Sequence, residues 1–218
     1  KKTKEVAEVY SFAKGHSVIA MPKMDGLTCS LTYRGGSLIA AETRGNGIIG
    51  EDVLHNALVV HNIPNKIDYQ DELVVDGEII CDYHSFEKFE SEYKNPRNFA
   101  SGSIRLLDSN ECENRKLSFV AWDVIKGFEK NEFLSNKLVQ LHNIGFSVVP
   151  FQWGNETENE EIEHSIEEIK NRCEELYYPI DGIVFKYNAI KEYNAAGRTD
   201  HHFKGGIAYK FYDEEYET

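Results

Sequence analysis

One lysine near the start of the chain stands where a nucleophile could act. Lys23 ends an apolar run, and Asp25 and Gly26 follow it almost at once. Residues 27–33 then alternate between apolar and polar side chains, which is the period of a half-buried strand. Taken alone, this stretch favours an ordinary strand-end lysine that reaches solvent along its stem. An amine held at the wall of a cleft could instead attack an electrophile.

Two later stretches carry polar groups that a bound ligand could use. Arg44 opens a glycine-rich loop over residues 44–52. Its planar guanidinium suits phosphate or ribose oxygens, and the glycines let the backbone pass close to a ligand. Glu78 interrupts the apolar run 73–80. A carboxylate buried in such a run costs free energy without a partner, so the sequence leaves open a structural salt bridge or a ligand contact.

The stretch 93–108 combines two arginines with small hydroxyl side chains and a glycine. Arg97 and Arg105, together with backbone N–H groups expected to be free around Gly102, form a set that suits phosphate oxygens of a DNA backbone. The set contains no pattern for reading bases. It therefore predicts contacts that do not depend on the DNA sequence.

Polar and aromatic residues also interrupt the strands predicted in the second half of the chain. Trp122 is either a core side chain or a platform for stacking, and composition does not separate the two. Lys186 and Lys210 interrupt the last two strands. Because a glycine follows Asp181, we expect Asp181 and Lys186 to face one cleft.

The overall charge argues against a nucleic-acid partner until its distribution is considered. The 218 residues carry a net charge of −13, whereas nucleic-acid binders usually show a basic surface. The basic residues gather in residues 94–105 and 186–210, and the acidic ones in residues 156–175 and at the C-terminus. Salt screens charges beyond roughly 8–10 Å, so a locally basic face can still bind phosphates.

The composition is that of a globular protein outside the membrane. Apolar residues make up 41% of the chain, and no run approaches the ~18 residues of a membrane span. The four cysteines are far apart, with no Cys-x-x-Cys pair, which argues against a zinc site and fits a reducing cytosol. We therefore predict a cytoplasmic protein with no membrane partner.

The pattern of elements predicts an α+β fold with antiparallel sheets packed against each other, flanked by helices, and a cleft between the sheets. A helix over residues 1–15 leads into one domain over residues 16–218. Strands are expected at 17–23, 27–33, 37–43, 73–80, 116–124, 180–186 and 207–211. Helices are expected at 4–14, 51–61, 85–93, 134–144 and 157–176, the last with a capping box formed by Thr157 and Glu160.

Six of these stretches resemble, in order, the motifs of NAD-dependent DNA ligases. They are Lys-Met-Asp-Gly at 23–26, the Arg44 loop, the Glu78 strand, Asn-Pro-Arg-Asn to Leu-Asp at 95–108, Asp-Gly to Lys at 181–186, and the strand around Lys210. The stretch 95–108 is the most specific of them. The resemblance covers residues 18–211 and implies the nucleotidyltransferase fold of the adenylation domain.

The resemblance also implies an activity. Lys23 would attack NAD, release nicotinamide mononucleotide and carry AMP, which then passes to the 5′-phosphate of nicked double-stranded DNA, with Mg²⁺ as the metal. The implied catalytic residues are Lys23, Asp25, Lys186 and Lys210. The implied nucleotide-binding residues are Gly26, Arg44, Glu78, Trp122, Asp181, Lys186 and Lys210, with Glu78 on the ribose and Trp122 on adenine. Asp181 and Glu78 are the implied metal ligands, and Arg97 and Arg105 the implied DNA contacts.

An ordinary lysine is protonated at neutral pH and cannot attack phosphorus. We expect like-charge repulsion from Lys186, Lys210 and a divalent cation to lower the pKa of Lys23. The same positive charges would stabilise the charge that develops on the α-phosphate.

The chain departs from the family's pattern at four places. Met21 stands where the family has a glutamate that contacts adenine, and Asp76 where it has arginine. Asn46 replaces an aspartate, and Lys204-Gly205 stands where the family has Arg-Trp.

Alternative interpretations remain at this stage. Met21 and Asp76 favour an ATP-dependent DNA or RNA ligase, whereas the Arg44 loop and residues 95–108 favour the NAD-dependent class. The nicotinamide-mononucleotide-binding, OB, zinc and helical domains are not in this sequence. It is therefore expected to be a fragment, a minimal relative, or a subunit of a split ligase that needs a partner. A catalytically silent nucleotide- or DNA-binding module is the alternative outside the enzymes.

Overall fold

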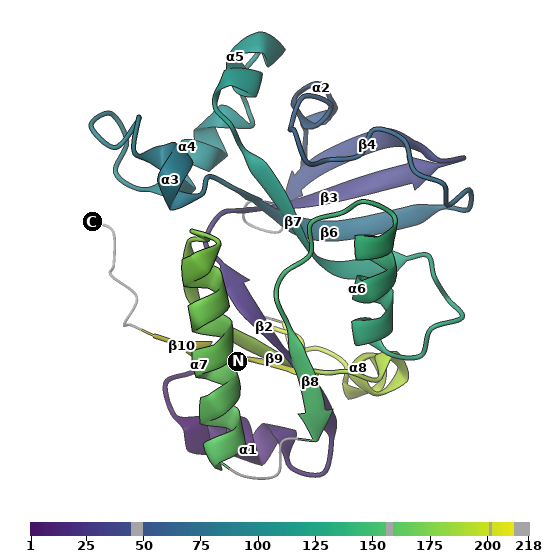
Figure 1. Cartoon of the computed structure of the whole chain (residues 1–218). Coiled ribbons are helices and arrows are strands. Elements are labelled where there is room, and N and C mark those ends of the chain that lie inside the picture. Colours follow the sequence, from purple (N-terminus) through teal and green to yellow (C-terminus); the bar gives the residue numbers. More distant parts are fainter. Residues whose placement is uncertain (45–49, 156–158, 201, 212–218) are drawn as a thin grey trace.

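Two consecutive strands divide the molecule into two sheets. In the computed structural model, which describes residues 1–44, 50–155, 159–200 and 202–211, β2 (Ser17–Met24) and β3 (Leu27–Arg34) leave one bend but enter different sheets (Figure 1). The bend contains Asp25 and Gly26. A Cβ at Gly26 would lie 2.2 Å from the carbonyl oxygen of Ile79, so only glycine lets this bend pack against the second sheet.

Within the described residues each sheet has five strands, and neighbours are antiparallel except for β1 and β10. The first sheet has the order β1 (Lys2–Thr3), β10 (Gly206–Lys210), β9 (Ile180–Tyr187), β2 and β8 (Gln152–Asn155). The second has the order β5 (Gly50–Asp52), β4 (Ser37–Arg44), β3, β6 (Leu73–Ile80) and β7 (Ser118–Lys126).

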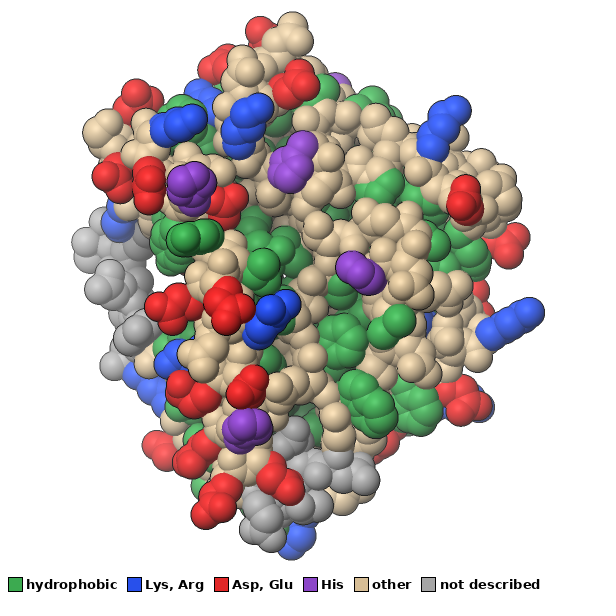
Figure 2. Space-filling view, viewed as in Figure 1, with side chains coloured by type: hydrophobic (Ala, Val, Ile, Leu, Met, Phe, Trp, Pro, Cys, Tyr) green, Lys and Arg blue, Asp and Glu red, His purple; other side chains and the backbone are tan. Residues whose placement is uncertain are grey.

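Helices cover the outer faces of this framework. Helices α1 (Val6–Ala13) and α7 (Asn159–Glu175) bury their apolar stripes on the first sheet, and the acidic residues of α7 gather on the outside (Figure 2). Helix α6 (Leu134–Asn143) packs on β7. The remaining helices are short: α2 (Leu54–Ala57), α3 (Tyr83–Phe86), α4 (Pro96–Ser103), α5 (Ser109–Asn114) and α8 (Ile190–Ala196).

The predicted α+β fold with antiparallel sheets is confirmed, because the period-2 alternation read from the sequence matches real burial. In β3, for example, Leu27, Cys29, Leu31 and Tyr33 are all buried. The predicted helices at 4–14 and 134–144 are also confirmed within a few residues. Among the described residues, no helix is both long enough and apolar enough to cross a membrane.

Two of the predicted helices were wrong or shortened, and the helix expected at 157–176 is confirmed as α7. The helix expected at 51–61 is a strand, β5, followed by the single turn α2, because Glu51 and Asp52 pair with β4 and Asp52 then accepts a bond from the N–H of Leu54. The helix expected at 85–93 is limited to α3. Helix α7 is described from Asn159, so the predicted cap residue Thr157 lies outside the described residues.

Elements β8, α4, α5 and α8 were missed. Helix α4 is the most important of them, because it contains most of the stretch 95–108. Its N-terminus carries the usual local signals, with Asn95 accepting a bond from the N–H of Asn98 and Pro96 at the first helical position.

A glycine-to-alanine change tests how tightly the first sheet is packed beside Lys23. Gly182 pairs with Lys23, and a Cβ there would lie 2.3 Å from the carbonyl oxygen of Tyr209 on β10. We expect Gly182→Ala to lower the free energy of unfolding by about 1–3 kcal/mol, as measured by urea denaturation. Gly102→Ala is the control, since no atom lies within 4 Å of a Cβ there. An unchanged stability for Gly182→Ala would contradict this packing.

Candidate active site

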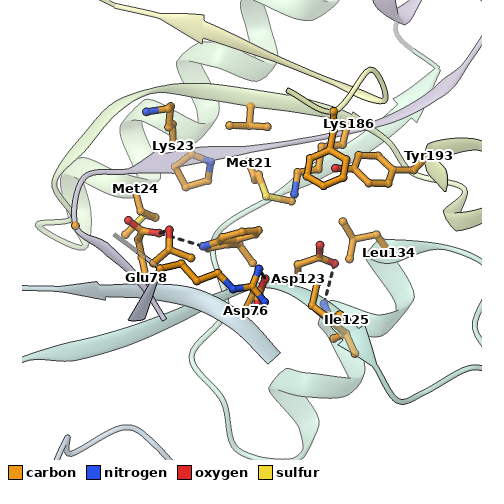
Figure 3. Close-up of a pocket in the computed structure, with 18 of the residues that line it drawn as sticks. Met21, Lys23, Met24, Asp76, Glu78, Asp123, Ile125, Leu134, Lys186 and Tyr193 are labelled. Atoms are coloured by element: carbon orange, nitrogen blue, oxygen red, sulfur yellow. Dashed lines mark hydrogen bonds and ion pairs between the residues drawn. The ribbon is translucent and has the colours of Figure 1, made fainter. Parts of the chain in front are cut away.

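A cavity of about 650 Å³ lies between the two sheets, within the range of ligand-binding pockets. Most of its wall comes from β2, β6, β7 and β9 (Figure 3). The rest comes from the bend after β2, from β3, β4 and α4, and from α6, α8 and Phe203. Of the predicted site residues, the lining includes Lys23, Asp25, Gly26, Arg44, Glu78, Arg97, Trp122, Asp181 and Lys186. Residues far apart in the sequence are therefore brought to one cavity.

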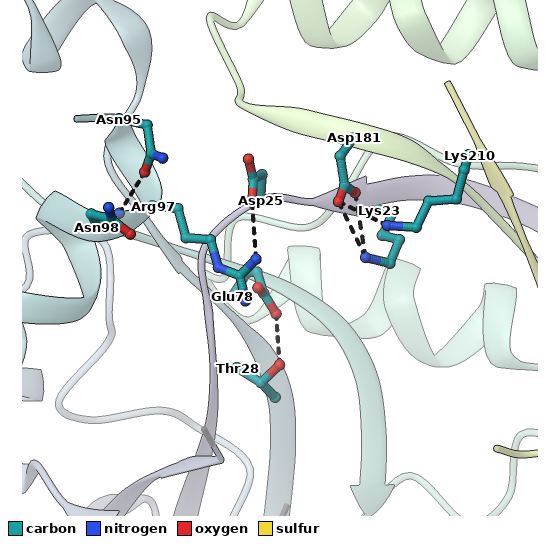
Figure 4. Close-up of polar contacts among 9 residues, drawn as sticks. All are labelled: Lys23, Asp25, Thr28, Glu78, Asn95, Arg97, Asn98, Asp181 and Lys210. Atoms are coloured by element: carbon teal, nitrogen blue, oxygen red, sulfur yellow. Dashed lines mark hydrogen bonds and ion pairs between the residues drawn. The ribbon is translucent and has the colours of Figure 1, made fainter. Parts of the chain in front are cut away.

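Lys23 and Lys210 share one carboxylate at one end of this cavity. The Lys23 amine lies 3.3 Å from Asp181 Oδ2, and the Lys210 amine lies 3.1 Å from the same oxygen (Figure 4). Strand β9 has a bulge here, because Lys23 pairs with Gly182 while Met24 pairs with Ile180. A bulge re-aims a side chain, and this one places Asp181 between the two amines. Lys210 joins the cluster from the end of β10 and does not itself line the cavity.

The pKa of Lys23 is lowered, and burial of the amine is the main cause. Lys210 lowers it further, whereas Asp181 opposes both effects. The predicted direction is therefore right, but its cause is mainly desolvation. Lys186 takes no part, because its ammonium lies 4.7 Å from the centre of the Trp122 ring instead.

Asp25 lies beside this cluster and faces an arginine. Its carboxylate is 3.9 Å from the Arg97 guanidinium, and its pKa is raised by burial and by the neighbouring Asp181. Its backbone N–H donates to the carbonyl of Pro179, which fixes the bend after β2. The arrangement brings two carboxylates and three cations to one end of the cavity.

Glu78 lies in the wall of the second sheet and has polar partners. It accepts a hydrogen bond from Thr28 at 2.9 Å and a longer one from the Trp122 indole at 3.4 Å. Burial raises its pKa to about 7. The predicted alternative of a structural salt bridge is not what the structure shows, since both partners are neutral. Thr28 was missed, because the pairing of β3 with β6 that places it opposite Glu78 is not visible in a single sequence.

Trp122 lines the cavity and also packs against the core, so it combines the two predicted alternatives. It occupies a bulge: Asp76 pairs with Asp123, while Gly77 pairs with Ala121. The extra residue lets both Trp122 and the next residue, Asp123, face the cavity. Asp123 was missed, because regular alternation would have turned it to the opposite side.

Arg44 is held by an acid that the sequence marked as unusual. Its guanidinium lies 3.1 Å from Asp76, a residue that is only 2% exposed. Both residues line the cavity. Residues 45–49, including Asn46, lie outside the described residues.

The two predicted DNA-binding arginines differ in their surroundings. Arg97 is exposed and lines the cavity beside Asp25. Arg105 is half-buried, pairs with Glu51 at 2.8 Å and donates to the carbonyl of Ser101. The expectation of free N–H groups around Gly102 was wrong, because Gly102 lies within helix α4, where the N–H groups belong to the helical ladder.

The predicted metal ligands do not meet in a common site. Asp181 is bonded to two amines, and Glu78 to Thr28 and Trp122. The described ranges contain no group of three or more His, Cys, Asp or Glu side chains that could hold a metal ion. The donor set therefore fits Asp181 as a single carboxylate ligand, and it does not fit Glu78.

Comparison with known proteins decides the family. Residues 3–214 match the NAD-dependent DNA ligase adenylation domain. The chain belongs to this family. It is 37% identical over 226 residues to a DNA ligase of Lachnoclostridium phytofermentans, covering all of this chain and 34% of that protein. It is also 37% identical over 205 residues to a DNA ligase of Helicobacter pylori, covering 89% of this chain and 31% of that protein.

The chain thus spans about a third of the length of the curated relatives it matches. Among solved structures, a putative ATP-dependent DNA ligase from Aquifex aeolicus has a TM-score of 0.51 at 14% identity, over 96% of this chain and 48% of that one. At this identity the likeness shows the fold alone. The fold is therefore that of DNA ligase nucleotidyltransferase domains, as the resemblance implied.

Removing the charge of Glu78 should affect stability in a pH-dependent way. Because burial raises its pKa to about 7, the folded protein favours the neutral acid, and stability is lost as pH rises from about 4.5 to 7. We expect Glu78→Gln to gain up to ~3 kcal/mol over the parent at pH 8. The gain should be small at pH 4.5. Urea unfolding of both proteins at the two pH values measures the difference. A stability difference that does not change with pH would contradict this.

Proposed function

We propose that this chain performs the adenylation step of an NAD-dependent DNA ligase, with Lys23 as the nucleophile. The observation that carries the proposal is the partly buried Lys23 amine, which shares Asp181 with Lys210 at one end of a cavity of nucleotide size. A lysine with a purely structural role would be neutralised by Asp181 alone, and a second amine on the same carboxylate adds repulsion between like charges. Two amines placed together suit an electrophile that carries negative charge, such as a phosphate.

The proposed reaction transfers AMP from NAD to the lysine. The neutral Lys23 amine attacks the α-phosphorus, so an N–P bond forms as the P–O bond to nicotinamide mononucleotide breaks. The lowered pKa of Lys23 supplies more of the neutral amine at neutral pH. The Lys210 ammonium is proposed to stabilise the negative charge that develops on the oxygens of the α-phosphate. Asp181 holds both amines in place and accepts the proton that the attacking amine loses.

The nucleoside is assigned to the middle of the cavity. The ribose hydroxyls are proposed to bind Glu78, which acts as an acceptor in its charged form. The adenine ring is proposed to stack on Trp122, where the Lys186 ammonium lies in this structure. Arg44, held by Asp76, supplies a guanidinium for ribose or phosphate oxygens.

Magnesium is part of the proposal only as a partner of the phosphates. Mg²⁺ commonly takes one or two protein carboxylates and completes its shell with phosphate oxygens and water. Asp181 is the carboxylate that we assign to it.

Nicked double-stranded DNA is the proposed acceptor, and the ligase activity as a whole is proposed to need further domains or a partner subunit. In-line displacement requires the leaving group to be aligned with the attacking amine, and poor alignment costs ~100-fold or more. No residue of the described cavity is assigned to the nicotinamide mononucleotide half. A partner domain that holds it is therefore proposed.

Labelling with radioactive nucleotides tests the proposed reaction. We expect the label of NAD, but not of ATP, to become attached to the protein, slowly for this chain alone and faster when a nicotinamide-mononucleotide-binding domain is added. Lys23→Ala should abolish the adduct. Lys14→Ala, on the exposed end of α1, is the control and should label like the parent. Labelling by ATP alone would favour the ATP-dependent class, and a labelled Lys23→Ala protein would place the nucleophile elsewhere.

Binding of nicked DNA tests the proposed roles of Arg97 and Arg105. Each phosphate contact releases counterions. Replacement of both arginines by Ala should therefore weaken binding, and the slope of log K against log salt concentration should fall by about two. Formation of lysyl-AMP should change much less. The measurement is fluorescence anisotropy of a nicked duplex over a salt series. A double variant that binds with the parent's affinity and salt slope would end this assignment.

A further inference from the structure

We propose that Asp123 selects the base, by accepting a hydrogen bond from the exocyclic amine of adenine. This inference rests on the proposed function, since it assumes that a nucleotide base stacks on Trp122. Nothing in the amino-acid sequence marks Asp123 as a site residue.

The bulge puts a carboxylate next to the stacking platform. Trp122 and Asp123 are consecutive, so their Cα atoms are about 3.8 Å apart, yet both line the cavity. The base that stacks on the Trp122 ring is proposed to turn the edge that carries its amino group towards Asp123. Figure 3 shows the Asp123 side chain pointing into the cavity, well away from Lys23 and on the same side as Leu134 and Tyr193.

The carboxylate of Asp123 has an oxygen available. Its Oδ1 accepts a bond of 2.8 Å from the backbone N–H of Val124, which fixes the side chain. Within the described ranges, Oδ2 takes part in no hydrogen bond, and the residue is half-buried in the cavity wall. Of the other acids of the cavity, Asp25 faces Arg97, Glu78 accepts a bond from Thr28, and Asp181 is shared by the two amines. Asp76 pairs with Arg44 through Oδ2, and its Oδ1, which has no hydrogen-bond partner among the described residues, is buried away from a ligand.

Met21 cannot perform this task. It lines the same cavity, is 2% exposed, and offers only a thioether, which is a weak acceptor. A base amine that faces Met21 alone would lose its hydrogen bonds with water without replacement. Asp123 supplies the acceptor from the other sheet, and a charged acceptor makes a stronger bond than a neutral one.

The chemistry of the bases turns this position into a test of selectivity. Adenine carries an amino group at C6, which donates, whereas hypoxanthine carries a carbonyl oxygen there, which accepts. A carboxylate attracts the first and repels the second. With asparagine at position 123, the amide oxygen can keep the bond from Val124 while its NH₂ group faces the base, which favours the carbonyl.

The experiment is a comparison of AMP, IMP and GMP binding by isothermal titration calorimetry, in which no leaving group has to be displaced. We expect the parent to bind AMP about tenfold or more tightly than IMP. Asp123→Asn should weaken the binding of AMP by a similar factor, and it should bind IMP at least as tightly as the parent does. Asp123→Ala is a second variant, for use if Asp123→Asn folds poorly. It should lower the affinity for AMP to that for IMP.

Glu129→Gln is the matched control. Glu129 is an acid three residues beyond the end of β7, is exposed, does not line the cavity, and accepts a bond from the N–H of Gly127. This variant should keep the parent's preference. A merely structural role of Asp123 would weaken both nucleotides alike.

Three results would overturn the proposal. They are a parent that binds AMP no better than IMP, a parent that prefers GMP, and an AMP-to-IMP ratio that is the same in parent and variants. The failure of the proposed function would look different, because it would appear as the absence of a Lys23-dependent adduct, whatever the preference between AMP and IMP.

Discussion

Two ammonium groups converge on a single carboxylate, and the arrangement of the cavity depends on that contact. Like charges repel, and Asp181, which accepts from both Lys23 and Lys210, offsets this repulsion. Asp181 raises the pKa of Lys23, while burial and Lys210 lower it, and the lowering is the larger effect. The balance leaves an amine that is held in place and still loses its proton more readily than an ordinary lysine.

Two β-bulges give the cavity its chemistry. One lies in β9 at Asp181 and the other in β7 at Trp122. A regular strand would turn every second side chain away, so Trp122 and Asp123 could not both face a ligand without an extra residue. Gly26 and Gly182 also shape the cavity, because the absence of a side chain at each lets two backbone segments come into contact. The sheets are therefore irregular at the places where the proposed function needs side chains to converge.

The sequence alone predicted the framework well, since apolar alternation determines which face of each strand is buried. It also predicted most of the charged residues in the cavity wall, because a charged residue within an apolar strand, such as Glu78 or Lys186, costs free energy unless it has a partner or a ligand. It failed where the decisive information is the pairing of strands. Nothing in the sequence marked Thr28 or Asp123 as a site residue. The apolar spacing of residues 51–61 indicated a helix, although Glu51 and Asp52 pair with β4 as a strand.

Burial and the neighbouring Lys210 make Lys23 a nucleophile, and the reactivity of this amine can be measured. A small electrophile is allowed to modify Lys23 across a pH series, and mass spectrometry of the peptide that contains Lys23 gives the rate at each pH. We expect a titration midpoint clearly below that of an ordinary lysine amine, and a rise of this midpoint in Lys210→Met. A Lys23 that titrates like an ordinary lysine, in the parent and in Lys210→Met alike, would contradict it.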